Sequence, residues 1–234
     1  MFRNLFFAAI LAALCAGLVA SVLQQARVVP LILQAETYEG EAAPHEHAPG
    51  TPAHEHHEHG ADEWAPRDGF ERTAYTVLAN LLMAAGFALV VGAVSLVANL
   101  PITLGNGAVW GLGGFLAFSL APAYGLAPEL PGMPAGDLLA RQLWWAGTAL
   151  ATGAALILLA KTRAAWALLA AALLIAAPHL VGAPQPESHE SAVPAFLAAN
   201  FAANALGTAA VFWVVLGAAF GRFNEYFAQG KGRS

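Results

Sequence analysis

Long apolar runs separated by short polar stretches dominate the hydropathy pattern of this chain. About 20 apolar residues in a helix cross the roughly 30 Å hydrocarbon core of a bilayer, and six runs come close to that length. We therefore expect an all-α integral membrane protein, a bundle of about six transmembrane helices. The expected spans are 4–26, which continues amphipathically towards Leu33, and then 74–98, 107–125, 142–160, 164–182 and 194–220.

The same pattern divides the chain into four parts. These are a first transmembrane helix (1–34), a polar loop rich in His and Glu (35–72), a bundle of about five further helices (73–223) and a C-terminal tail (224–234). Pro122 and Pro178 interrupt the ends of the third and fifth runs, although membrane helices tolerate proline when neighbouring groups satisfy the freed carbonyl. Five spans are therefore the alternative to six.

Composition narrows the class of protein further. Charged residues make up 11% of the chain, against about 25% in a typical soluble domain, and 58% of the residues are hydrophobic. The net charge of −5 argues against a nucleic-acid partner, which would need a basic surface. The single cysteine, Cys15, has no partner within the chain for a disulfide.

Basic residues predict the orientation, because positively charged loops remain on the cytoplasmic side. With a cytoplasmic N-terminus, the six inner residues are Arg3, Lys161, Arg163, Arg222, Lys231 and Arg233. The four outer residues are Arg27, Arg67, Arg72 and Arg141. We therefore expect a multi-pass protein of the bacterial inner membrane, with both termini in the cytoplasm and loop 35–72 in the periplasm.

Six of the eight histidines fall within fifteen residues of that loop. They are His45, His47, His54, His56, His57 and His59. Neutral imidazole is a common metal ligand, and it suits zinc, copper, iron, nickel and divalent cobalt. Prolines and glycines among the histidines keep the stretch irregular, so we expect labile metal capture without a fixed geometry. The alternative is a solvated, low-complexity spacer.

A second outer cluster holds the other two histidines, with two glutamates beside one of them. It consists of His179, Glu187, His189 and Glu190. His179 is expected inside the fifth span or at its outer end, and an ionisable group at membrane depth is a functional hypothesis by default. We expect this cluster to receive the metal. The alternative is a histidine that hydrogen-bonds to a loop carbonyl.

Few polar residues lie inside the expected spans. Those that we single out are Asn80, Thr148, Thr152, Asn200, Asn204 and Thr208. The last three are four residues apart, so they share one helix face. Such a face either lines a path for a hydrated ion or holds helices together.

Two further sets of residues, spaced four apart, predict close helix packing and an ion pair. Ala199, Ala203 and Gly207 would let a neighbouring helix approach closely. Asp137 and Arg141 would pair on a helix, either as a surface ion pair of little energetic value or as a gate near the metal entry.

Sequence motifs of enzymes are missing. The chain has no G-x-x-x-x-G-K-[ST] phosphate loop, no H-E-x-x-H and no G-x-S-x-G. We therefore expect no catalytic activity and no permanent cofactor, and the bound metal is expected to be the transported ion.

Several stretches together resemble the CbtA family of probable cobalt transporter subunits. They are "QQARVVPLILQAETYE", "EWAPRDGFERTAYTVLAN", "APELPGMPAGDLLARQLWWAGTALATG" and "PHLVGAPQPESHESAVPAFLAANFAANALGTAAVFWVVLG". The resemblance implies uptake of divalent cobalt, usually for cobalamin biosynthesis, and a small single-helix, His-rich CbtB-type partner. It assigns no catalytic residues. The alternatives are a nickel or zinc permease, or a membrane-bound metal sensor or buffer that transports nothing.

Overall fold

The computed structural model describes residues 2–39, 66–67 and 69–229, and helices account for most of them. The chain order is α1 (Phe2–Leu23), η1 (Gln24–Val28), α2 (Val29–Glu39), α3 (Phe70–Ala98), α4 (Gly107–Phe115), η2 (Leu116–Leu120), α5 (Ala121–Gly125), α6 (Leu138–Lys161), α7 (Ala165–Val181) and α8 (Ala195–Gln229). The η elements are single π-helical turns. The described residues contain no β-strand, which confirms the all-α class.

Five helical segments of the described chain are long and apolar enough to cross a membrane. They are Arg3–Tyr38, Phe70–Ala98, Gly107–Gly125, Leu138–Lys161 and Ala195–Gln229. The predicted fifth span is the apolar helix α7, which has only 17 residues. At about 1.5 Å per residue, α7 measures roughly 26 Å, slightly less than the hydrocarbon core.

The first and last long segments extend beyond their predicted ends. The first helix does not stop near residue 26, because the π-helical turn η1 continues it into α2 and on to Glu39. The last helix runs to Gln229. Its amphipathic end packs on the start of α1, where Asn4 Nδ2 donates a hydrogen bond to the carbonyl of Phe227 at 2.9 Å.

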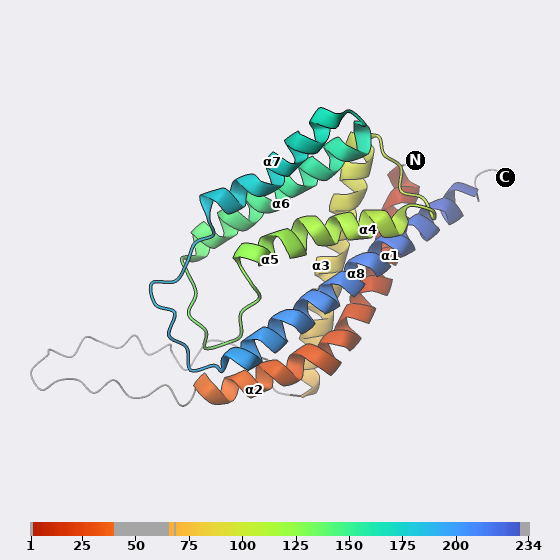
Figure 1. Cartoon of the computed structure of the whole chain (residues 1–234). Helices are drawn as coiled ribbons and strands as arrows, with labels where there is room; N and C mark the ends of the chain where they lie inside the picture. Colours follow the sequence, from red (N-terminus) through yellow and green to blue (C-terminus); the bar gives the residue numbers. More distant parts are fainter. Residues whose placement is uncertain (1, 40–65, 68, 230–234) are drawn as a thin grey trace, which may run out of the picture.

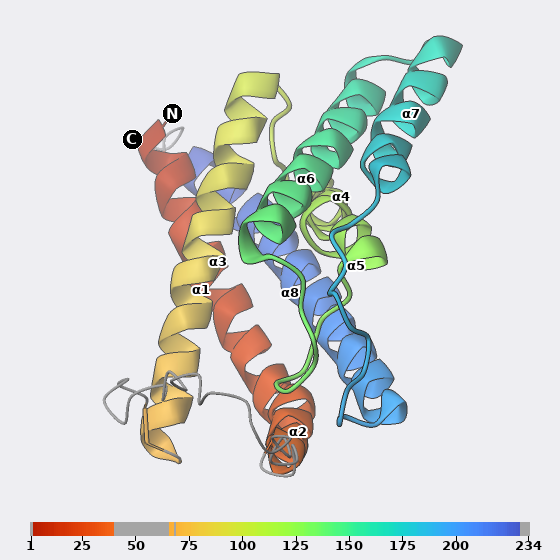
Figure 2. The ribbon, with the colours of Figure 1, turned by 90° about the vertical axis from the view of Figure 1, so that its left-hand side faces the viewer.

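The helices alternate in direction between two ends of the bundle. Figures 1 and 2 show the start of α1, the end of α8 and the turn between α6 and α7 at one end, and the end of α2 and the starts of α3 and α8 at the other. This matches the predicted arrangement, in which both termini share a side with the basic turn Lys161–Arg163. That this side is cytoplasmic stays a prediction.

Small residues allow close packing, although not those that the sequence singled out. Helix α1 lies against α3 and α8 through a row of alanines that are at most 2% exposed: Ala8, Ala9, Ala12, Ala13, Ala16 and Ala20. By contrast, Ala199, Ala203 and Gly207 are exposed, so the prediction that they pack closely was wrong for the described chain.

Helices α4 and α8 approach until their backbones touch. A Cβ atom on Gly111 would lie 2.2 Å from the carbonyl oxygen of Trp213, and one on Gly217 would lie 2.2 Å from the carbonyl oxygen of Gly107. Only glycine permits this approach, because any side chain would overlap backbone atoms of the neighbouring helix. This contact holds α4, and with it η2, in place over α8.

Candidate functional site

The six predicted metal-capturing histidines, His45 to His59, lie outside the described residues. Two charged residues near the ends of this segment are described. Glu36 lies in the last turn of α2, and Arg72 lies in the first turn of α3.

His179 lies in the last turn of α7, as the sequence predicted, and its ring contacts two aromatic side chains. The ring centroid is 5.2 Å from that of Tyr124 and 5.5 Å from that of Trp144, both in edge-on arrangements. Trp144 Nε1 donates to the carbonyl of Pro178 at 3.0 Å, which ties α6 to this turn. His179 Nδ1 is buried and has no hydrogen-bond partner.

The remaining members of the second outer cluster do not surround His179. Glu187, His189 and Glu190 are exposed on the segment between α7 and α8. Among the described residues, no three His, Cys, Asp or Glu side chains meet where they could hold one metal ion. A metal-receiving role for this cluster therefore stays a prediction.

A cavity of about 550 Å³, which we call the central cavity, lies between the first helical segment, α3, η2 and α8. Its lining residues are Ala20, Gln24, Val28, Val29, Ile32, Arg72, Thr76, Met83, Phe87, Phe118, Ser119, Phe201, Ala205, Thr208, Ala209, Phe212 and Trp213. Both π-helical turns contribute, η1 through Gln24 and Val28 and η2 through Phe118 and Ser119. Such turns are rare and frequently mark functional sites.

A buried hydrogen-bond network sits on the η1 side of the central cavity. Asn80, which is 6% exposed, donates from Nδ2 to Ser21 Oγ at 3.1 Å and to Gln24 Oε1 at 2.7 Å. Ser21 Oγ donates in turn to the carbonyl of Gly17 at 2.8 Å. Because Asn80 uses both amide protons on these partners, its own carbonyl oxygen remains an acceptor, and the Gln24 amide group remains a donor.

Aromatic rings make the opposite wall of the central cavity. Trp213 stacks on Phe118 with centroids 5.5 Å apart and lies 4.9 Å from Phe87. Its indole Nε1 donates to Ser119 Oγ at 3.1 Å, which fixes the only hydroxyl of η2 at the cavity wall. The cavity thus combines an apolar surface with a few fixed polar groups, as small-molecule and ion sites do.

A smaller cavity of about 240 Å³, the side cavity, adjoins the central one. Four residues line both: Phe118, Ser119, Ala205 and Ala209. Leu126 and Pro128, from the segment after α5, also line the side cavity. The two cavities therefore follow the same stretch of α8.

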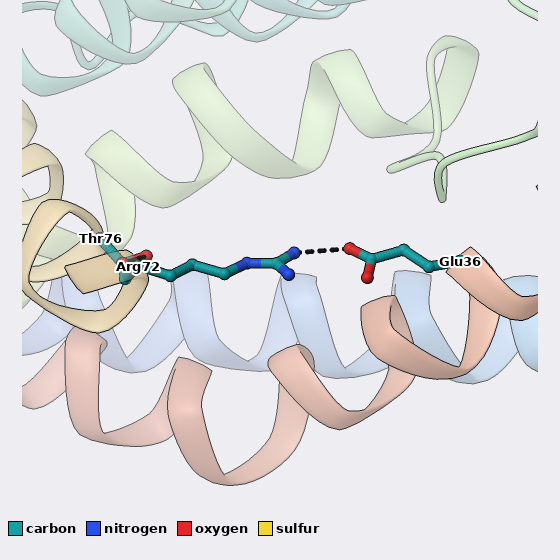
Figure 3. Close-up of polar contacts among 3 residues, drawn as sticks. All are labelled: Glu36, Arg72 and Thr76. Carbon is teal, nitrogen blue, oxygen red and sulfur yellow. Dashed lines mark hydrogen bonds and ion pairs between the residues drawn. The ribbon is translucent and has the colours of Figure 1, made fainter. Parts of the chain in front are cut away.

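An ion pair crosses the edge of the central cavity at the end where α2 stops and α3 starts. Arg72 Nη2 lies 2.5 Å from Glu36 Oε1, and each side chain is 35% exposed (Figure 3). Thr76, one turn further along α3, donates from Oγ1 to the Arg72 carbonyl at 2.9 Å. Arg72 and Thr76 both line the cavity.

The predicted polar faces of the spans reach the cavity only in part. Thr208 lines it directly, and Asn80 bonds to Gln24, which lines it. Asn204 Nδ2 donates to Asn200 Oδ1 at 2.7 Å, so these two bond to each other along α8. Thr148 and Thr152 are buried on α6 and line neither cavity.

The predicted Asp137–Arg141 ion pair is wrong. Asp137 is the N-cap of α6, where its carboxylate accepts a hydrogen bond from the Ala140 amide at 2.8 Å. Arg141 Nη2 instead lies 2.5 Å from Glu129 Oε2, on the segment that precedes α6. The capping bond satisfies an otherwise unpaired helix amide, so the carboxylate is held at the start of the helix and away from Arg141.

Sequence reasoning missed Gln24, Ser119 and the Glu36–Arg72 pair. Gln24 and Gln25 were visible as a polar interruption of the first apolar run, and Ser119 as a lone hydroxyl in the third. Neither signal shows that the two segments face the same cavity, because that depends on how the helices pack.

Apolar helices of membrane-spanning length, running in alternating directions around a partly polar cavity, define a multi-pass membrane protein. The particular family follows from comparison with known proteins. The model of the CbtA family, described as a probable cobalt transporter subunit, matches residues 2–225, and the chain belongs to this family. No curated protein and no solved structure matches the chain.

Family membership confirms the resemblance seen in the sequence and, with it, an assignment to cobalt transport in a membrane. The family description also makes the chain a subunit, so it works with at least one partner.

Proposed function

We propose that this chain is the membrane subunit of a cobalt uptake system of the bacterial inner membrane, and that divalent cobalt crosses through the central cavity. The observation that carries the proposal is the family match over residues 2–225, together with a partly polar cavity enclosed by the same helices. A small single-helix, His-rich CbtB-type protein is the partner that we expect.

The His-rich stretch is proposed to collect the ion next to this cavity. Residues 40–69 connect α2 to α3, and Glu36 and Arg72, close to the two ends of this connection, pair at the edge of the cavity. The chain thus tethers His45 to His59 from both sides to this end of the bundle, and we propose that they supply cobalt to the cavity. Tethering raises the local concentration of the ion without requiring a fixed coordination sphere.

The central cavity is large enough for the ion to keep its water. Six waters at about 30 Å³ each occupy roughly 180 Å³, well below the cavity volume of about 550 Å³. Removing a divalent ion from water without full compensation is very costly. Because no three strong ligands meet among the described residues, we propose that cobalt crosses in hydrated form, past Gln24, Ser119 and Thr208.

The experiment that tests this function is uptake of cobalt-57 into cells with and without the chain, alongside its partner. We expect accumulation in the cytoplasm that depends on the chain and that excess unlabelled nickel or zinc inhibits less than unlabelled cobalt. Label that stays at the membrane would indicate a metal buffer. Stronger inhibition by nickel or zinc would indicate a permease for that metal.

The second outer cluster is proposed to pass the ion on, and His179 is its most testable member. Because Nδ1 of His179 is buried without a partner, we expect His179→Ala to reduce the initial rate of cobalt-57 uptake by roughly tenfold if this nitrogen takes part in the transfer. His189→Ala, at an exposed position, should have a smaller effect. Normal uptake by a His179→Ala protein that is present at the wild-type level removes His179 from the pathway.

A further inference from the structure

The ion pair between Glu36 and Arg72 spans an opening between two helix ends. Helix α1 packs against α3, but beyond the π-helical turn η1 the chain turns away from α3 and α2 packs against α8 (Figure 2). The central cavity occupies the space that this divergence creates. Ile32, one turn before Glu36, lines the cavity, and so does Arg72. The pair therefore lies where an ion would enter.

We infer that Glu36 is the first carboxylate of the bundle to bind the incoming divalent cation, and that the cation displaces Arg72 from it. This inference rests on the proposed function, because it assumes that cobalt enters at this edge of the cavity. In the absence of the ion, the Arg72 guanidinium neutralises the Glu36 carboxylate, so the pair carries no net charge. When the ion binds, the carboxylate ligates it and the guanidinium is released.

The exposure of the pair favours exchange over a purely structural role. Each side chain is 35% exposed, and ion pairs in contact with solvent contribute little to stability. Separating the two groups therefore costs little. Carboxylate oxygens are suitable ligands for divalent ions, so Glu36 gains a new partner when Arg72 leaves.

The charge of the competing ion decides whether the exchange is favourable. A monovalent ion carries the same charge as Arg72 and cannot donate the hydrogen bond that the guanidinium donates to Glu36, so it does not displace Arg72. A divalent ion brings twice the charge to the same carboxylate. The pair would thus select divalent over monovalent cations at the entrance, without a cluster of strong ligands.

Two neighbouring acids at the same end of the bundle are also paired with arginines, but away from the central cavity. Glu71, in the first turn of α3, pairs with Arg67, just before that helix, with 2.9 Å between Glu71 Oε2 and Arg67 Nε. Glu129 pairs with Arg141 at the start of α6. None of these four residues lines the central cavity. They provide control positions of the same chemistry.

The test measures KM and the maximal rate of cobalt-57 uptake for Glu36→Gln and Arg72→Gln in cells that carry the full-length chain and its partner. Glu36→Gln removes the carboxylate that binds the ion and should raise KM by roughly fivefold to tenfold. Arg72→Gln removes the guanidinium that competes with the ion for Glu36 and should lower KM by roughly twofold to fivefold. Arg67→Gln removes an arginine of the same end and should leave KM unchanged.

A pair with a purely structural role would not shift KM in opposite directions in the two variants. If the pair only held α2 and α3 together, both variants would lower thermal stability and raise KM alike. An unchanged or raised KM for Arg72→Gln, or an unchanged KM for Glu36→Gln, overturns the inference. Should the unaltered chain give no uptake above cells that lack it, the proposed function fails first, so the two failures are distinguishable.

Discussion

Gly111→Ala is expected to disrupt the packing of α4 on α8. The new Cβ atom would lie 2.2 Å from the carbonyl oxygen of Trp213 and 3.0 Å from the Cα atom of Val214. These are backbone atoms of a long helix, so relief requires the helices to separate. Overpacking commonly costs about 1–3 kcal/mol, and a backbone clash of this kind should cost roughly 3 kcal/mol or more. We expect the melting temperature of the purified protein to fall by roughly 10 °C.

Gly113→Ala is the matched control on the same helix. Its Cβ atom would meet Leu156 Cδ1 at 3.7 Å, an ordinary van der Waals distance. This variant should therefore melt close to the unaltered protein. If Gly111→Ala and Gly113→Ala have the same melting temperature, α4 and α8 do not make the backbone contact described above.

Replacing all six histidines of residues 45–59 by asparagine should strongly reduce transport at low cobalt. Asparagine keeps the stretch polar but removes the imidazole ligands. If the histidines raise the local concentration of cobalt beside the cavity, their loss should lower the initial uptake rate by roughly tenfold at limiting cobalt. At saturating cobalt the rate should not change, because the cavity is then supplied directly from solution.

A shuffled version of residues 45–59 is the control for this prediction. It keeps all six histidines but changes their spacing, and a collector without fixed geometry should tolerate the change. Unaltered uptake at limiting cobalt after the six replacements would exclude the collecting role. Loss of uptake on shuffling alone would show that the spacing of the histidines matters.

Run length and hydropathy were sufficient to predict most of the helices. The third span was expected over 107–125 and extends from Gly107 to Gly125, despite Pro122 within it. The π-helical turn η2 directly precedes this proline, and local π-helical adjustment is one way in which a membrane helix accommodates proline. Hydropathy reports only that a segment is buried in lipid or protein, so it predicted the span but not the turn.

The cavity could not be predicted for the same reason. Two π-helical turns help to line it, and nothing in the hydropathy of residues 24–28 or 116–120 distinguishes them from an α-helix. Likewise, the spacing of four residues predicted an ion pair between Asp137 and Arg141. The spacing alone does not show that Asp137 caps α6 and that Arg141 pairs with Glu129. Contacts between distant segments, such as Glu36 with Arg72, depend on the packing of whole helices.

The central claim is that cobalt crosses between the first helical segment, α3, η2 and α8. Blocking the cavity tests this claim most directly. Ala205 lines both the central and the side cavity, whereas Ala203, on the same helix, is exposed on the outside. The measurement is the initial rate of cobalt-57 uptake by cells that carry Ala205→Trp or Ala203→Trp, each present in the membrane at the wild-type level. We expect Ala205→Trp to reduce uptake to that of cells without the chain and Ala203→Trp to retain it. Wild-type uptake by Ala205→Trp would contradict passage through the cavity.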